Sequence, residues 1–326
     1  MQEVKVKTPI IESIMEKSKY SKDDESYSIV KKGVAEFISN IVTSKNPEEK
    51  INKLALDEMI AHIDDLLSKQ MDEVLHNKDF QKLESTWRGI RFLVERTNFN
   101  ENIKIVLSDI TKEEALEDFD SNLDITQSVM YKQVYSHEYG QFGGEPIGAI
   151  IGDYELDKTN TDMTFLNKMS SIAAMSHSPF LTSLSSKFFG LENYAELENI
   201  KSMLEGPQYT RWRTFRENED AKYVGLLATR FLTRSPYLPE DNPIKSFNYR
   251  ENVEGSHEHL LWGNSAYTFA TRLTESFADF RWCGNIIGPK GGGAVKDLPT
   301  YLYENYGSVQ AKIPTEVLIT DRREYE

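Results

Sequence analysis

The feature that most constrains the fold of this chain is a long stretch of helical periodicity between residues 57 and 94. Apolar side chains recur there at steps of three and four, with charged side chains between them. The repeating positions are Met59, Ile60, Ile63, Leu66, Leu67, Met71, Val74 and Leu75, followed by Phe80, Leu83, Trp87, Ile90 and Val94. Because a polar segment interrupts the pattern at 76–79, we predict two helices packed as a hairpin, with Trp87 as the anchor.

Two shorter amphipathic segments precede this stretch. Thr8 can cap a helix whose apolar face carries Ile10, Ile11, Ile14 and Met15. A second helical pattern carries Val30, Val34, Phe37, Ile38 and Ile41. Because isolated helices shorter than about 12–15 residues are marginal in water, the first helix must dock either on the core of this chain or in a groove on another protein.

Strand and helix patterns alternate after residue 100. Strands are predicted in 102–110, 144–156, 223–234 and 314–321, and helices in 111–119, 125–136, 162–177 and 263–280. Thr111 and Glu114 have the spacing of a capping box. The chain is therefore predicted to be a mixed α+β protein, in which N-terminal helices precede a core of mixed sheet with packed helices. We expect an N-terminal helical segment at 1–50 and a core at 51–326, subdivided into a helical hairpin at 51–100 and an α/β part at 101–326.

Charge and composition exclude several function classes. The 326 residues include 52 acidic and 38 basic side chains, a net charge of −14, which disfavours binding to nucleic acid or to an anionic membrane. No apolar run reaches the roughly 18 residues that a membrane span needs, and the charged N-terminus lacks the apolar segment of a signal peptide. The single cysteine, Cys283, cannot form an internal disulfide. We therefore expect a cytoplasmic protein that neither inserts in a membrane nor binds nucleic acid.

A glycine-rich segment, IIGPKGGGAVKDL at 286–298, raises the question of a nucleotide site. A phosphate-binding loop of the Walker type needs its lysine directly after the last glycine and a helix beyond it. Here Lys290 precedes Gly291, Gly292 and Gly293, and Ala294 follows them. A nucleotide-dependent enzyme that uses the loop 288–293 is kept as the alternative function, but close backbone packing is the preferred interpretation of the glycines.

The remaining candidates favour interfaces over chemistry. Histidines 257 and 259 lack the partners of a zinc site, and Cys283 beside Trp282 lacks a nucleophile signature. The segment 211–216 combines arginines with aromatic residues, a composition enriched at protein interfaces. Its members are Arg211, Trp212, Arg213, Phe215 and Arg216. We expect no catalytic residue, metal or cofactor, and we predict packing or interface roles for these five residues and for Trp87, Trp282 and the three glycines.

Five long motifs together resemble one known family. They are QKLESTWRGIRFLVERTNF, YGQFGGEPIGAIIGDYE, LEGPQYTRWRTFRENEDAKYVGL, FATRLTESFADFRWCGNIIGPKGGGAVKDLP and KIPTEVLITDRREYE. In this order they are similar to the large subunit of the type VI secretion contractile sheath, the TssC/VipB family. The resemblance runs from about residue 10 to the last residue, and family members continue beyond it into a C-terminal region with strands that join neighbouring subunits.

This resemblance implies a structural protein that is not an enzyme. It implies pairing with a small sheath subunit (TssB/VipA type), stacking with further copies around an inner tube of Hcp rings, attachment to a baseplate, and contraction that drives the tube outward. It also implies disassembly by an AAA+ unfoldase of the ClpV type, which would bind the helix that carries Ile10, Ile11, Ile14 and Met15. For the glycine-rich loop it implies a family motif with a packing role.

Overall fold

The structure is a computed structural model that describes residues 8–16, 25–42, 53–139, 141–197, 203–240, 247–254, 256–304 and 310–317. The chain divides into two compact units. The first comprises Met1–Asp72 and Pro239–Arg250, and the second comprises Glu73–Leu238 and Glu251–Glu326. Each is described by itself below.

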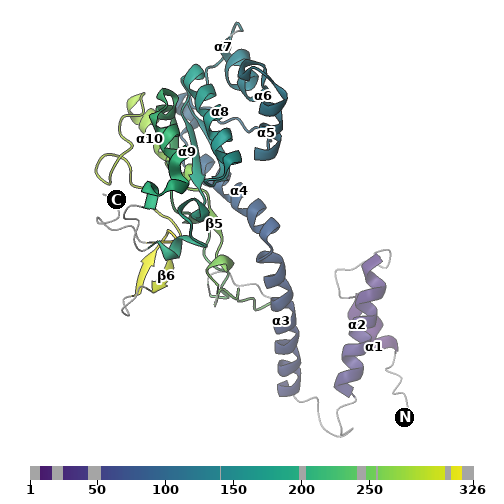
Figure 1. Cartoon of the computed structure of the whole chain (residues 1–326). Coiled ribbons are helices and arrows are strands. Elements are labelled where there is room, and N and C mark those ends of the chain that lie inside the picture. Colours follow the sequence, from purple (N-terminus) through teal and green to yellow (C-terminus); the bar gives the residue numbers. More distant parts are fainter. Residues whose placement is uncertain are drawn as a thin grey trace. The chain divides into compact units, whose positions relative to one another are not determined.

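The first unit is helical (Figure 1). It contains α1 (Thr8–Glu16), α2 (Glu25–Val42) and most of α3 (Lys53–Leu75). Helix α1 packs on α2, and the apolar face predicted for α1 is divided: Ile11 and Met15 are buried, whereas Ile14 is exposed. The helices predicted from periodicity around residues 8–17, 30–41 and 57–75 are all present.

A three-stranded parallel sheet lies at the centre of the second unit. Its strands are β1 (Ile150–Leu156), β2 (Phe180–Leu184) and β3 (Val224–Leu227), in the order β1-β2-β3. Phe180 pairs with both Ile150 and Val224, so these three residues lie side by side across the sheet. All five residues of β2 are buried, as expected for the central strand of a parallel sheet covered on both faces.

Helices cover both faces of this sheet. Helix α8 (Asn160–Ser176) lies on the face to which Phe180 points, because the Phe165 and Phe180 rings meet edge to face at 6.1 Å. Helix α10 (Ser265–Phe280) lies on the other face, where Ser183 donates a hydrogen bond to its N-cap residue Asn264 at 2.7 Å. Helix α4 (Lys78–Glu95) packs on α10, and Gly89 allows the close approach because a Cβ there would lie 2.4 Å from the Tyr267 ring. The sheet and its helices confirm the predicted mixed α+β class.

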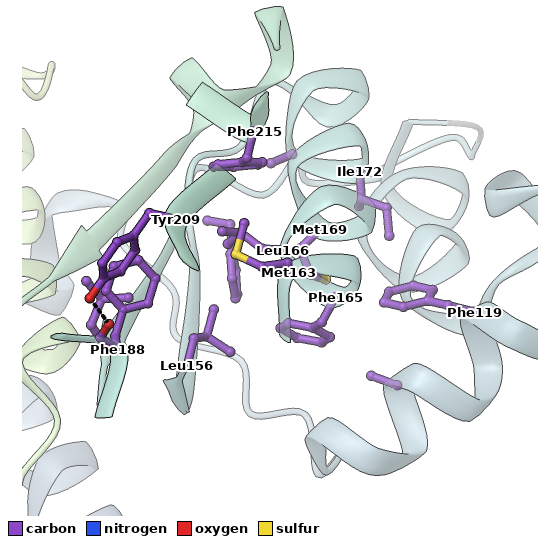
Figure 2. Packing of buried hydrophobic residues seen from close by; sticks show 14 of the residues in the cluster. Phe119, Leu156, Met163, Phe165, Leu166, Met169, Ile172, Phe188, Tyr209 and Phe215 are labelled. Atoms are coloured by element: carbon purple, nitrogen blue, oxygen red, sulfur yellow. Dashed lines mark hydrogen bonds between the residues drawn. The ribbon is translucent and has the colours of Figure 1, made fainter. Parts of the chain in front are cut away.

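The main hydrophobic core lies on two sides of α8 (Figure 2). Leu166 points toward the sheet, whereas Ile172 points to the other side, where helix α5 (Lys112–Ser121) adds Phe119. Phe165 and Met169 of α8 also belong to this core. Thr111 caps α5 in the predicted capping box with Glu114. The predicted helix at 125–136 forms in pieces, namely η2 (Ile125–Gln127), α6 (Val129–Tyr131), the π-helix η3 (Lys132–Ser136) and α7 (His137–Tyr139).

Two short antiparallel pairs complete the second unit. Strand β4 (Phe231–Leu232) pairs with β5 (Trp262–Gly263), and β6 (Tyr301–Glu304) pairs with β7 (Gln310–Ile313). The strand predicted at 223–234 is therefore two strands, β3 and β4, separated by Thr229 with a φ of 65°.

Two strand predictions are wrong in part or in whole. Residues 103–111 belong to no strand, and Val106 and Leu107 are exposed. The alternating pattern at 102–110 therefore has no strand to pair with in the described part of the chain. Within 314–317 a single β-bridge joins Thr315 to Phe231, and strand β7 ends just before this segment, at Ile313. The remainder of that prediction, 318–321, lies outside the described residues.

Trp87 does not anchor a hairpin core, because its side chain on α4 is 60% exposed. The hairpin itself stays a prediction, since most of α3 lies in the first unit and α4 in the second. The predicted domain boundaries at residues 50 and 100 also stay predictions.

Candidate functional site

Helix α9 (Thr210–Glu217) carries the arginine and aromatic residues singled out in the sequence. Its two aromatic side chains face the core: Phe215 is buried, and the Trp212 ring stacks on it at 5.8 Å and meets Phe188 edge to face at 5.4 Å. The spacing of three residues places both rings on one face of the helix. Trp212 and Phe215 therefore pack inside this chain.

The three arginines of α9 are solvent-exposed, and Arg216 lies beside the aromatic pair, because it lines the same pocket as Trp212 and Phe215. Arg213 donates hydrogen bonds to the Glu205 carbonyl at 2.7 Å and to the Thr210 hydroxyl at 3.3 Å, and Arg211 and Arg216 are exposed. The predicted cluster therefore consists of an aromatic pair packed on the core and three exposed arginines. Whether these arginines contact another protein stays a prediction.

A pocket of about 600 Å³ opens between α9 and the edge strand β3. Its lining residues are Leu184, Trp212, Phe215, Arg216, Asn218, Glu219, Ala221, Lys222, Val224 and Leu226. The walls are largely apolar, and charged side chains of both signs stand among them. Nothing in this set combines a nucleophile with a general base, so the pocket suits packing against another segment better than chemistry.

The glycine-rich loop folds back on itself. The amides of Gly291 and Gly293 both donate to the Gly288 carbonyl, at 3.3 and 2.9 Å, and Gly292 has a φ of 87°. A Cβ on Gly291 would lie 2.4 Å from the Ile287 carbonyl oxygen, and one on Gly292 would lie 2.2 Å from that of Asn285. The turn therefore requires these glycines, and two of its amides donate hydrogen bonds within the turn itself. A phosphate-binding loop instead directs its amides at the ligand and is followed by a helix, and residues 294–304 after this loop form no helix.

Exposed apolar side chains lie at the C-terminal end of α10 and in the segment that leads from it into the glycine-rich loop. Trp282 is 67% exposed, and Phe280 and Ile287 are exposed near it in sequence. The Trp282 ring covers Gly284, where a Cβ would meet it at 2.5 Å. Desolvation raises the pKa of the Cys283 thiol, the opposite of what an activated nucleophile needs.

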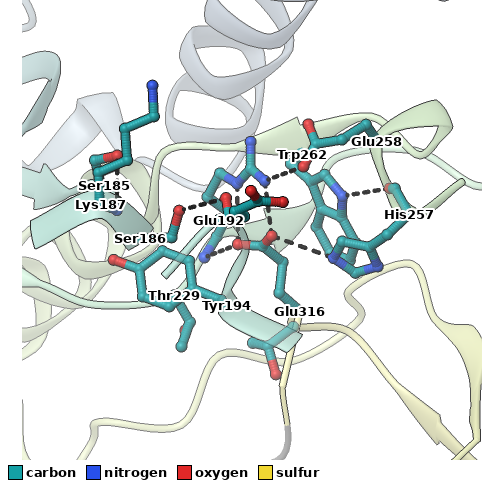
Figure 3. A network of polar contacts seen from close by, with 12 residues as sticks. Ser185, Ser186, Lys187, Glu192, Tyr194, Thr229, His257, Glu258, Trp262 and Glu316 are labelled. Carbon is teal, nitrogen blue, oxygen red and sulfur yellow. Dashed lines mark hydrogen bonds and ion pairs between the residues drawn. The ribbon is translucent and has the colours of Figure 1, made fainter. Parts of the chain in front are cut away.

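A buried ion-pair network that sequence reasoning missed surrounds Glu316 (Figure 3). Its carboxylate, 0% exposed, accepts hydrogen bonds from Arg230 Nη2 at 2.7 Å and Nε at 2.9 Å, and lies 3.2 Å from His257 Nε2. Burial raises the pKa of Glu316, but the hydrogen bonds and charges of His257 and Arg230 outweigh it and leave the pKa below its ordinary value. The network ties the segment after β3 to the segment after β7.

A second buried network joins α4 to the segment after β4. Arg234 pairs with Glu251 at 2.6 Å and with Glu84 of α4 at 2.9 Å. His76 lies 3.5 Å from Glu251 and stacks on His259, with ring centroids 4.1 Å apart. The histidines considered for zinc thus lie among arginine and glutamate side chains or stacked rings, and no group of three or more His, Cys, Asp or Glu in the described part of the chain could hold a metal ion.

The helix predicted to bind an unfoldase is α1, which carries all four residues, Ile10, Ile11, Ile14 and Met15. Because Ile11 and Met15 are buried and Ile14 is exposed, only part of the predicted face is available while α1 packs on α2. No helix among the described residues is long and apolar enough to cross a membrane.

Comparison with known proteins adds an assignment to this geometry. Residues 57–326 match the family model VipB, described as EvpB/VC_A0108, tail sheath N-terminal domain. The chain is similar to the type VI secretion system sheath protein TssC1 of Pseudomonas aeruginosa, with 38% identity over 279 residues. That match covers 83% of this chain and 56% of the relative, so the chain spans about half the length of the curated relative it matches. The chain therefore belongs to the TssC/VipB family of type VI secretion sheath proteins.

Proposed function

We propose that this chain serves as the large subunit of a type VI secretion contractile sheath. It pairs with a small sheath subunit of the TssB/VipA type, and the pairs stack with further copies around an inner tube of Hcp rings above a baseplate. Contraction drives the tube outward from the cytoplasm. The match to the tail sheath model over residues 57–326 carries this proposal.

The surface of the second unit supports a structural role. Trp87 and Trp282 are more than half exposed, and the α9 arginines face solvent. Tryptophan and arginine are enriched among residues that dominate binding energy at protein interfaces. An isolated domain has little reason to expose two such rings, whereas a subunit that contacts several neighbours has two candidate anchors there.

The mechanism we propose is mechanical. A sheath assembled in a metastable extended state can contract without bound fuel, because its subunits move into a lower-energy packing and release energy stored during assembly. Interfaces with two discrete arrangements are an established route to such large motions. The chain contributes rigid bodies to this lattice, and its buried ion-pair networks hold each segment in place while the subunit moves.

Removal of the contracted sheath is assigned to an AAA+ unfoldase of the ClpV type that binds α1. Ile14 is exposed for that contact, and Ile11 and Met15 become available only when α1 leaves α2.

Electron microscopy tests the proposed function. The chain is extended to the full length of its relative and expressed together with the small sheath subunit. We expect hollow tubes in negatively stained samples. Small uniform particles, in a preparation where both subunits are folded and present in equal amounts, would contradict the proposal.

A further inference from the structure

A half-exposed apolar stripe runs along α3. Ile60, Ile63, Leu67, Met71 and Val74 are each between 41% and 48% exposed. At 3.6 residues per turn these five side chains fall within an arc of about 80°, and Leu66 lies beside them with 52% exposure. We propose that this stripe, the α3 seam, binds an amphipathic helix whose apolar face is flanked by lysine or arginine.

The spacing of the stripe specifies a helical partner. From Ile60 to Val74 the steps are three, four, four and three residues, an average of 3.5. That value is the period of a coiled-coil seam, in which an apolar stripe stays in contact with a second helix along its whole length. An extended peptide or a small ligand would not match a 3.5-residue repeat carried over two heptads.

The charge of α3 specifies the chemistry of that partner. The helix carries six acidic side chains against two lysines: Asp57, Glu58, Asp64, Asp65, Asp72 and Glu73 against Lys53 and Lys69. Asp57 and Asp64 border the seam on one side, and Glu73 lies toward the other. Since charges flanking a coiled-coil seam select the partner, lysine or arginine is expected at the matching positions.

The same charge argues against a second copy of this chain as the occupant. A second α3 would bring its own Asp57, Asp64 and Glu73 to the borders of the seam, and like charges across an interface are repulsive. The seam gives the proposed sheath subunit a surface for a different protein, and in that respect the inference rests on the proposed function. Its test uses neither the small sheath subunit nor the inner tube, so the two can fail separately.

Designed peptides provide the probes. One 21-residue peptide carries leucine at the seam positions and lysine at the flanking positions, the second replaces every lysine by glutamate, and the third is a scrambled version of the first. Fluorescence anisotropy measures the binding of each labelled peptide to the whole chain. We expect the lysine peptide to bind at least tenfold more tightly than the other two.

Two neighbouring substitutions locate the binding surface. Ile63→Glu places a negative charge in the seam, whereas His62→Glu places the same charge on the opposite face of α3. We expect I63E to weaken binding of the lysine peptide at least tenfold and H62E to leave it within twofold. Equal effects of the two variants, with helix content by circular dichroism unchanged, would mean that the peptide follows net charge alone and would overturn the proposal. Binding of the glutamate peptide as tight as that of the lysine peptide would also overturn it, as would dimerisation of the unmodified chain that I63E abolishes.

Discussion

Glu316 shows how a single carboxylate can hold two segments together. It is completely buried, and Arg230 reaches it with two side-chain nitrogens while the Arg230 amide donates to Oε2 at 3.1 Å. Taking one partner from a buried pair leaves an uncompensated charge, which costs far more than an exposed pair is worth. Glu258 offers the comparison, because its half-exposed carboxylate pairs with the same Arg230 at 3.1 Å.

We predict that Glu316→Gln lowers the free energy of unfolding at pH 7 by roughly 3 kcal/mol or more, and that Glu258→Gln lowers it by no more than about 1 kcal/mol. The pKa of Glu316 is lowered in the folded state, so its stabilisation is present above the ordinary glutamate pKa and is lost as the pH falls through the lower folded value. Denaturant titrations should therefore show that the difference in free energy of unfolding between the unmodified chain and E316Q becomes smaller below about pH 4. A deficit that is equal at pH 7 and pH 3 would contradict this account.

Gly89 tests the packing of α4 on α10. A Cβ at this position would lie 2.4 Å from the Tyr267 ring, which is buried. We predict that Gly89→Ala destabilises the fold by about 1–3 kcal/mol by overpacking, although alanine favours helix by up to about 1 kcal/mol. Gly148→Ala is the control, because nothing lies within 4 Å of its Cβ position; thermal melts in which the two variants behave alike would contradict the packing argument.

The candidate site was partly predictable at this scale. The sequence marks Trp212 and Phe215 by type, and their three-residue spacing within a helix accounts for their shared inward face. Glu316 could not be found in this way, because its partners Arg230 and His257 are 86 and 59 residues away along the chain. Only the fold brings such partners together.

At the scale of elements, helices with a sustained repeat were predictable, whereas strands were predicted only in part: β1, β3 and β4 lie within predicted strands, and β2 was missed. The periodicity over 57–75 and 162–177 corresponds to α3 and α8. Strand β2 lacks an alternating pattern because both of its faces are buried. Residues 102–110 have the pattern, but no strand in the described part of the chain pairs with them. Strand formation depends on a partner that local sequence does not specify.

The α1–α2 pair gives a prediction at the same scale. Ile14 is exposed and Ile11 is buried in α1, so substitutions at the two positions separate unfoldase binding from packing. We expect Ile14→Glu to weaken binding to a ClpV-type unfoldase at least tenfold with no change in helix content. Ile11→Glu should also reduce the circular dichroism signal at 222 nm, because it places a charge in a buried position. Normal unfoldase binding by I14E in a pull-down would show that α1 is not the recognised helix.

For the whole molecule, the proposed function lies in its contacts with other proteins, and the family assignment supports that proposal. Its described histidine, acidic and cysteine residues form no metal-binding group, the glycine loop uses two of its amides within its own turn, and the chain belongs to a sheath family. The exposed Trp87 and Trp282 and the α3 seam lie on different elements. A subunit in a lattice needs several distinct surfaces of this kind.

The most direct test of this account is the molar mass of the chain in the presence of the small sheath subunit. The two proteins are co-expressed, purified through a tag on the small subunit, and measured by size-exclusion chromatography with light scattering. We predict a stable complex with one copy of each protein, and so a mass equal to that of the small subunit plus the 37.5 kDa of this chain. Recovery of the tagged small subunit without this chain, while this chain is present and folded in the unbound fraction, would contradict the proposed function.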